Sequence, residues 1–200
     1  MNVRLVPAIV LTVGLHFLSG CSLLKADPHI ASLGDSIFEA WWYPSANLGH
    51  HGDTVARMLA RFPLVVPGHG YTTVVLMGGS NDVLLGIDPE TTIQNLETLG
   101  QLTLQQHAEP VLCQVPPIFH GWLPGDTKDY GSQVLELNRR IAQLAAEHHW
   151  KLIDFYTQLA DHPSYSSDGV HMRRSGYLVM LVLFTTRCLI ASTTIEPVSA

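Results

Sequence analysis

Short apolar runs separated by stretches of helical length are the feature that most constrains what this chain can fold into. Four apolar runs have the length of buried strands, at 30–33, 72–77, 111–115 and 151–155. Segments with helical spacing or helix-start signals follow them, at 54–62, 88–107, 131–149 and 173–191. Pro63 is predicted to end the first of these helices. Because strands that alternate with such helices form parallel βαβ units, the sequence predicts one mainly parallel sheet with helices on both faces.

The composition is that of a globular protein of one domain, or at most two small ones. The chain has 200 residues, 46% hydrophobic and 14% charged, which excludes a disordered tail, a coiled coil, a collagen-like repeat and a polytopic membrane protein. Lys and Arg number 11 against 17 Asp and Glu, a formal net charge of −6, and no basic run interrupts it. Nucleic-acid binding needs a basic face, so the charge argues against that function.

The N-terminal residues have the pattern of a signal peptide. Arg4 precedes an apolar stretch, 5–18, which is shorter than the roughly 20 residues that span a bilayer. An ordinary cleaved secretory signal and a buried helix are the alternatives. The sequence Leu18-Ser19-Gly20-Cys21 resembles the bacterial lipobox, which implies acylation of Cys21 and cleavage before it, and Ser22 points to the outer membrane. We expect a signal peptide at 1–20, a lipidated tether at 21–28 and a folded domain at 29–200.

Residues with catalytic chemistry lie at the ends of the predicted strands, where open parallel sheets form their sites. Ser36, in Gly34-Asp35-Ser36, is either an exposed nucleophile or the cap of the next helix. Asn81 follows a glycine pair and is either a donor to an oxyanion or part of a plain turn. Asp168 stands three residues before His171, a spacing that suits a carboxylate holding an imidazole ready to take a serine proton. Together they supply the parts of an acyl-transfer site.

These blocks, in this order, resemble the signature of the SGNH (GDSL) hydrolase family. The matching segments are Gly34-Asp35-Ser36, 47–54, 79–82 and 168–171. The stretch 52–63 is especially similar to the bacterial thioesterase/lysophospholipase and acetylesterase branches of that family. The resemblance implies a three-layer α/β/α sandwich of flavodoxin-like type, and it implies neither a metal nor an organic cofactor.

The resemblance also implies a role for each matching residue. Ser36 would be the nucleophile, His171 the general base and then acid, and Asp168 its orienting carboxylate. The oxyanion hole would comprise the Ser36 N–H, the Gly52 N–H and the Asn81 amide. Two features depart from the pattern. Met172 replaces a frequent Pro, and the His50-His51 pair stands where smaller residues are usual, either in contact with substrate or without a special role.

The sequence therefore predicts a lipid-anchored carboxylic-ester hydrolase that works through an acyl-serine. Its expected partners are a small-molecule, lipid or glycan ester and the membrane that holds the anchor. The aromatic triplet 41–43 either stacks on a sugar, lines an acyl pocket or packs beneath a loop, and it favours O-acyl groups on glycans. The alternatives are a lysophospholipase or short-chain lipid esterase, and a binding lipoprotein of the same fold without turnover.

The remaining cysteines and histidines have simpler interpretations. Cys113 and Cys188 sit on apolar segments, as core residues or as partners in one bridge. The 11 histidines show no convincing metal-ligand spacing. In particular, His148 and His149 are adjacent on a predicted helix and so do not share a face.

The lipobox generates a direct prediction. Cys21→Ser protein should lose the mass of the acyl chains and leave the membrane fraction, because the sulfur that carries the diacylglyceryl group is gone. Intact-mass spectrometry and membrane fractionation measure both properties. A variant that stays in the membrane fraction at an unchanged acyl mass would contradict the lipobox assignment.

Overall fold

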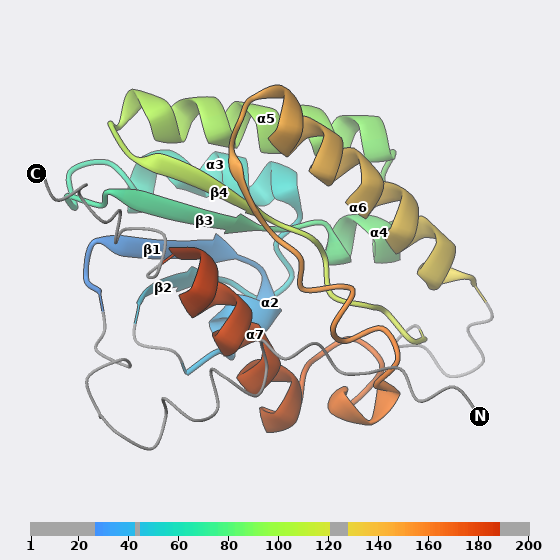
Figure 1. Ribbon diagram of the computed structural model, residues 1–200. Coiled ribbons are helices and arrows are strands. Elements are labelled where there is room, and N and C mark those ends of the chain that lie inside the picture. Colours follow the sequence, from blue (N-terminus) through green and yellow to red (C-terminus); the bar gives the residue numbers. More distant parts are fainter. Residues whose placement is uncertain (1–26, 43–44, 121–127, 189–200) are drawn as a thin grey trace, which may run out of the picture.

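The computed structural model describes residues 27–42, 45–120 and 128–188, and a five-stranded parallel sheet lies at its centre (Figure 1). The strands are β1 (Ile30–Gly34), β2 (Ala46–Gly49), β3 (Thr73–Met77), β4 (Glu109–Cys113) and β5 (Lys151–Ile153). Their order is β2-β1-β3-β4-β5, and every neighbouring pair is parallel. This is the strand order of flavodoxin-like folds, so the predicted fold class is confirmed. The predicted signal peptide and Cys21 lie outside the described residues.

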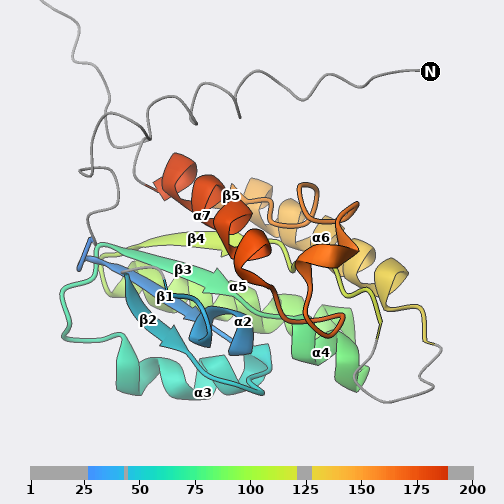
Figure 2. The same ribbon diagram turned by 90° about the horizontal axis from the view of Figure 1, so that it is seen from below.

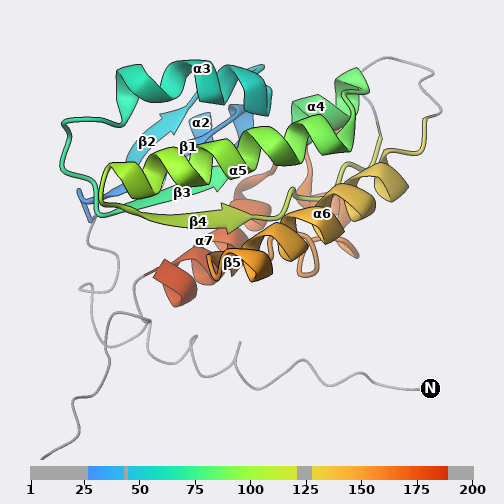
Figure 3. The ribbon, with the colours of Figure 1, turned by 90° about the horizontal axis from the view of Figure 1, so that it is seen from above.

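Helices cover both faces of the sheet, as Figures 2 and 3 show from opposite sides. The larger layer consists of α3 (Val55–Val65), α5 (Pro89–Gln105) and α6 (Tyr130–Glu147), with the short α4 (Ser80–Leu85) at one end. The other layer consists of α2 (Ser36–Glu39) and α7 (Arg174–Cys188), and a 3-10 turn, Pro163–Tyr165, precedes α7. The sheet is therefore the middle of three layers.

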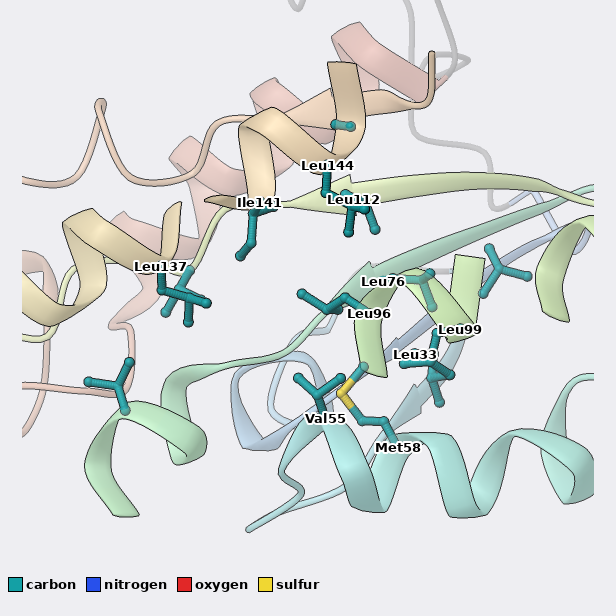
Figure 4. Close-up of a cluster of buried hydrophobic side chains, with 14 of the residues drawn as sticks. Leu33, Val55, Met58, Leu76, Leu96, Leu99, Leu112, Leu137, Ile141 and Leu144 are labelled. Atoms are coloured by element: carbon teal, nitrogen blue, oxygen red, sulfur yellow. The ribbon is translucent and has the colours of Figure 1, made fainter. Parts of the chain in front are cut away.

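Alternate residues of the central strands enter two separate cores, because successive side chains of a strand point to opposite faces. Leu33, Leu76 and Leu112 pack against α3, α5 and α6 in the larger core (Figure 4). Val75, Met77 and Val111 pack against α2 and α7 in the smaller one. Both faces of these strands are thus apolar, which explains why they read in the sequence as continuous apolar runs and not as alternating ones.

Several short elements have no counterpart among the predicted helices and strands, and β2 and α4 are the two that matter for the site. The edge strand β2 comprises only Ala46–Gly49, and none of its residues is fully buried, so it lacks an apolar run. It is defined by its pairing with β1, where Ala46 is the partner of Ala31 and Gly49 the partner of Gly34. The short helix α4 replaces the turn that the glycine pair suggested, and Gly86 ends it in the left-handed conformation.

Several boundaries also differ from the prediction. Pro63 does not end the helix, since α3 continues to Val65 and the Val66 N–H still reaches the Phe62 carbonyl at 3.1 Å. Strand β4 lies two residues earlier than predicted, and β5 is shorter than predicted. Helix α6 ends before His148 and His149, so these two histidines are not on a helix face. The residues predicted to extend α7 beyond Cys188 lie outside the described residues.

Cys113 and Cys188 are core residues and do not form a disulfide bridge with each other. Both are free, buried thiols in the smaller core, and burial raises the pKa of each. Among the described helices, α7 included, none combines the length and the apolar character that a membrane span requires.

Gly49 is the glycine on which the packing of β2 against α2 depends most. A Cβ at this position would overlap the backbone of Glu39 and come within 2.7 Å of the Phe38 carbonyl carbon. Gly49→Ala should therefore lower the free energy of unfolding by about 1–3 kcal/mol, the usual range for overpacking. Urea denaturation measures the change, and Gly131→Ala is the control, because the nearest atom to its Cβ is 3.4 Å away. Equal stability of the two variants would contradict this account.

Candidate active site

Ser36 lies at the carboxyl end of β1, where the strand turns into the short helix α2 (Figure 1). Asp35 caps that helix, since its Oδ1 accepts the Ile37 N–H at 2.9 Å. Ser36 is thus the first helical residue and not the cap, and its own N–H has no partner within the helix. This turn leaves the Ser36 side chain only partly buried at the edge of the sheet.

His171 joins Ser36 to Asp168 by two short hydrogen bonds. The Ser36 Oγ lies 2.9 Å from the His171 Nε2, although 135 residues separate the two in sequence. On the other side of the ring, Nδ1 lies 2.6 Å from the Asp168 Oδ2. With the proton on Nδ1, as a hydrogen bond to a carboxylate requires, Nε2 is the acceptor that faces the serine hydroxyl.

Asp168 is held as an anion by its hydrogen bonds. Burial raises the pKa of its carboxyl, but hydrogen bonds from the His171 backbone and imidazole and from the Val170 backbone outweigh it, so the net shift is downward. Its second oxygen, Oδ1, accepts the N–H of His171 at 2.7 Å and that of Val170 at 3.0 Å. The carboxylate therefore fixes both the ring and the backbone of His171.

The loop that carries Asp168 and His171 is tied to a second loop, which follows β4. The Phe119 N–H donates to the Gly169 carbonyl at 2.8 Å. Gly169 has φ +91, and a Cβ there would come within 2.6 Å of the His120 ring. A side chain at this position would thus displace His120 as well as strain the backbone.

Gly52 lies on the loop after β2, and Asn81 lies in the first turn of α4, the helix that follows β3. The strands β2 and β3 are the neighbours of β1 on either side. Gly52 has φ +73, a conformation that favours glycine. The buried Asn81 donates from Nδ2 to the carbonyl oxygen of Asp53 at 2.8 Å, so the residue after Gly52 holds the Asn81 amide. The Ser36, His171 and Asp168 side chains are thus in direct contact, whereas Gly52 and Asn81 are linked to each other through Asp53.

Three polar residues of this region were not singled out by the sequence analysis. Asp53 is buried and forms an ion pair with Arg61 of α3, with 2.7 Å between Nε and Oδ2. Asp82 is also buried and accepts the Val55 N–H at 3.1 Å and the Thr92 hydroxyl at 3.2 Å. Asp53 and Asp82 lie within the matched blocks, and Arg61 lies within the family-like stretch 52–63, but the sequence does not show that these residues contact one another.

The aromatic residues after α2 have different surroundings. Trp41 is buried and stacks on Phe38 and Tyr177 at ring distances of 5.4 and 6.4 Å, so it is a core residue. Trp42 is 51% exposed. Tyr43 lies outside the described residues.

His50 and His51 lie exposed beside Gly52. Their rings stack with a 4.7 Å separation, and His51 pairs with Glu39 at 3.2 Å. That pairing lowers the pKa of the Glu39 carboxyl. Within the described parts of the chain, no group of three or more His, Cys, Asp or Glu side chains is placed to hold a metal ion.

The chain is similar in sequence to several known proteins. Residues 32–179 match the sequence pattern of the GDSL-like Lipase/Acylhydrolase family. The chain is 28% identical over 138 residues to Esterase TesA of Pseudomonas aeruginosa, a match that covers 66% of this chain and 63% of that protein. It is 31% identical over 131 residues to Thioesterase 1/protease 1/lysophospholipase L1 of Escherichia coli K12, which covers 64% and 59% respectively. The matches thus span about three fifths of each relative's length.

A solved structure shares the fold. The GDSL-like lipase of Bacteroides thetaiotaomicron superposes with a TM-score of 0.72 at 22% identity and covers 89% of this chain and 94% of that one. At this level of identity the likeness concerns the fold.

Asp35 generates a prediction about pH and stability. Burial raises the pKa of its carboxyl from 3.8 to about 6, against the opposing effects of the Ile37 N–H and His171. Between about pH 4 and pH 6 the folded protein therefore keeps a proton that the unfolded chain has lost, so this group's contribution to the free energy of unfolding falls as the pH rises. Asp35→Asn, which keeps the oxygen that caps α2, should be more stable relative to the wild type at pH 7 than at pH 4.

Denaturant titrations at a series of pH values measure that difference. Asp88→Asn is the matched control, because this exposed carboxyl also precedes a helix but its side chain makes no capping bond. A stability difference between Asp35→Asn and wild type that stays constant from pH 4 to pH 7 would show that the Asp35 carboxyl is not perturbed by burial.

Proposed function

Because the chain belongs to the GDSL-like lipase/acylhydrolase family, we propose that it hydrolyses carboxylic esters through an acyl-serine intermediate on Ser36. The observation that carries the proposal is the continuous hydrogen-bonded path from the Ser36 Oγ through His171 to Asp168, with distances of 2.9 and 2.6 Å. A serine hydroxyl is a weak nucleophile unless a base takes its proton, and this arrangement provides the base and a carboxylate that orients it.

Acylation begins when the Ser36 Oγ attacks the ester carbonyl carbon and His171 Nε2 takes the hydroxyl proton. The carbonyl oxygen becomes an oxyanion, for which the Ser36 N–H, the Gly52 N–H and the Asn81 amide are the proposed donors. The tetrahedral intermediate then collapses, the bond to the alcohol breaks, and His171 gives its proton to the departing oxygen. The products of this half-reaction are the free alcohol and an ester of Ser36.

Deacylation repeats the sequence with water as the nucleophile. His171 takes a proton from the water, the resulting hydroxide attacks the acyl-Ser36 carbonyl, and the proton returns to the Ser36 Oγ as the acid departs. Asp168 stays ionised throughout and stabilises the imidazolium that forms in each half-reaction. The downward shift of the Asp168 pKa supports that role.

The substrate that we propose is an O-acyl group on a glycan. The half-exposed Trp42, six residues after the nucleophile, offers an aromatic face of the kind on which sugars stack. Trp41 adds nothing to this argument, because it is buried. A second candidate is a lysophospholipid or short-chain lipid ester. The similarity to Thioesterase 1/protease 1/lysophospholipase L1 of Escherichia coli favours the lysophospholipid.

We also propose that the protein acts as a lipoprotein of the bacterial outer membrane, anchored through Cys21. The lipobox-like sequence and Ser22 support this placement, and the Cys21→Ser measurement described above tests it. An envelope location disfavours acyl-CoA and other cytosolic thioesters as substrates.

A fluorophosphonate probe tests the mechanism, because the Oγ of an activated serine displaces its fluoride. We expect one adduct per protein, mapped to Ser36, and its absence from His171→Ala, which lacks the base. Ser164→Ala, which changes an exposed serine before the catalytic loop, should label like the wild type. A folded wild-type protein that acquires no adduct would leave a binding lipoprotein without turnover as the better description.

A panel of esters then separates the two substrate classes. Acetylated oligosaccharides, lysophospholipids and p-nitrophenyl esters of increasing acyl length are compared by kcat/KM. A preference for acetyl groups on sugars supports the glycan substrate. A preference for long acyl chains would assign the protein to lipid esters instead.

A further inference from the structure

We propose that Arg61, which takes no part in the mechanism above, is a positioning residue that aligns the oxyanion donors through Asp53. This inference rests on the proposed function, since it concerns how the same site is held in its working geometry. Arg61 lies on α3, the helix that packs along β1 and β2 (Figure 2). Its side chain reaches the ends of those strands, at Gly34 and Leu48.

The guanidinium of Arg61 joins three segments that surround the nucleophile. Its Nε donates to the Asp53 Oδ2 at 2.7 Å. Its Nη2 donates to the carbonyl of Leu48, in β2, at 2.9 Å and is 3.4 Å from the carbonyl of Gly34, at the end of β1. A planar guanidinium can serve several acceptors in a fixed fork, which the single ammonium of a lysine cannot reproduce.

Asp53 transmits this position to the proposed donors. It directly follows Gly52, so its placement fixes the peptide that precedes it. Its carbonyl oxygen accepts one N–H of the Asn81 amide at 2.8 Å, and because an amide nitrogen carries two N–H groups in one plane, that bond sets the direction of the other. The Asp53 side chain accepts a hydrogen bond from Arg61, and its main-chain carbonyl accepts one from Asn81. Asp53 therefore links the Arg61 guanidinium to both proposed oxyanion donors, Gly52 and Asn81.

Burial makes this link stiff. The Asp53 side chain is 5% exposed and that of Arg61 is 23% exposed, so little water is available to replace their bond. The other carboxylate oxygen of Asp53 lies 3.6 Å from the ring of the exposed His50, a longer contact than the one with Arg61. Loss of the guanidinium would therefore free the Asp53 side chain and, with it, the loop from 50 to 54.

Other contacts keep α3 in place independently of Arg61. The Asp82 carboxylate accepts the Val55 N–H at 3.1 Å, and Thr54 caps the helix by accepting the Arg57 N–H at 3.3 Å. The apolar face of the helix, including Met58 and Phe62, remains buried in the larger core. A change at Arg61 is thus expected to shift the loop before α3 while the helix itself stays in place.

Steady-state kinetics of Arg61→Gln and Arg61→Lys on a short-chain p-nitrophenyl ester tests the proposal. Both should lower kcat by roughly 10- to 100-fold with little change in KM, the loss typical of misplacing a catalytic group by about 1 Å. Arg140→Gln is the matched control. Arg140 of α6 is likewise an ion-paired arginine, but its partners, Glu90 and Glu136, lie away from the site, so this variant should keep the wild-type kcat. Asp53→Asn, which breaks the same ion pair from the other side, should reproduce the Arg61 effect.

A double variant separates positioning from a general structural role. Asn81→Ala alone should lower kcat by about 10²–10³-fold, as the loss of one oxyanion donor does. Because Arg61 acts partly through Asn81, Arg61→Gln should cause a smaller loss in the Asn81→Ala background than in the wild type, where both donors are misplaced. Losses that multiply fully would overturn the proposal. So would a wild-type kcat in the Arg61 and Asp53 variants, or failure of all three to fold.

A readout that needs no activity completes the test. The side-chain amide signals of Asn81 in a ¹⁵N–¹H spectrum, assigned by their loss in Asn81→Ala, should move in Arg61→Gln and stay in place in Arg140→Gln. Unmoved signals would overturn the inference even if kcat falls. If the wild type hydrolyses no ester but the signals move, the proposed function fails while the positioning by Arg61 stands.

Discussion

The parallel pairing of β1 with β2 on one side and β3 on the other is the constraint on which the rest of the structure depends. The connection after β1 leads to α2 on one face of the sheet, whereas those after β2 and β3 lead to α3 and α5 on the opposite face. In open parallel sheets, such a reversal leaves a crevice at the carboxyl ends of the central strands. Three segments leave the sheet at this edge: the start of α2 with Ser36, the loop after β2 with Gly52, and the start of α4 with Asn81.

Buried polar groups stabilise these three segments. Asp35, Asp53 and Asp82 are each nearly inaccessible to water, and each is bonded to a neighbouring backbone or side chain. A buried carboxylate is unfavourable unless such partners are in place, so the loops can adopt only arrangements that provide them. The bonds that Asp53 and Asp82 accept thus help to specify the geometry of the site, whereas among the described residues the Asp35 Oδ2 has no hydrogen-bond partner.

Asp168 and His171, in contrast, lie on a more exposed loop. Asp168 is 53% exposed and His171 27% exposed, on a loop that follows the last strand. Local hydrogen bonds shape this loop, notably those from the His171 and Val170 backbone to Asp168 and from the Gly169 N–H to the Ser166 Oγ at 2.8 Å. The contact between Phe119 and Gly169 joins it to the loop after β4. The nucleophile at the end of a central strand is therefore paired with a base whose loop is stabilised mainly by hydrogen bonds within its own turn.

The sequence by itself determined the class of fold and the candidate residues. Apolar runs buried on both faces are visible in the chain as continuous hydrophobic segments, and Ser36, Asp168 and His171 belong to short blocks whose chemistry can be inferred locally. Only the tertiary structure decided the rest. The strand β2 is defined only by its pairing with β1. Trp41 is a core residue because four aromatic rings surround it. The guanidinium of Arg61 contacts Gly34, Leu48 and Asp53, which lie on three different segments. Contacts between residues far apart in the chain leave no periodic pattern in the sequence, so they become apparent only when the sheet brings their segments together.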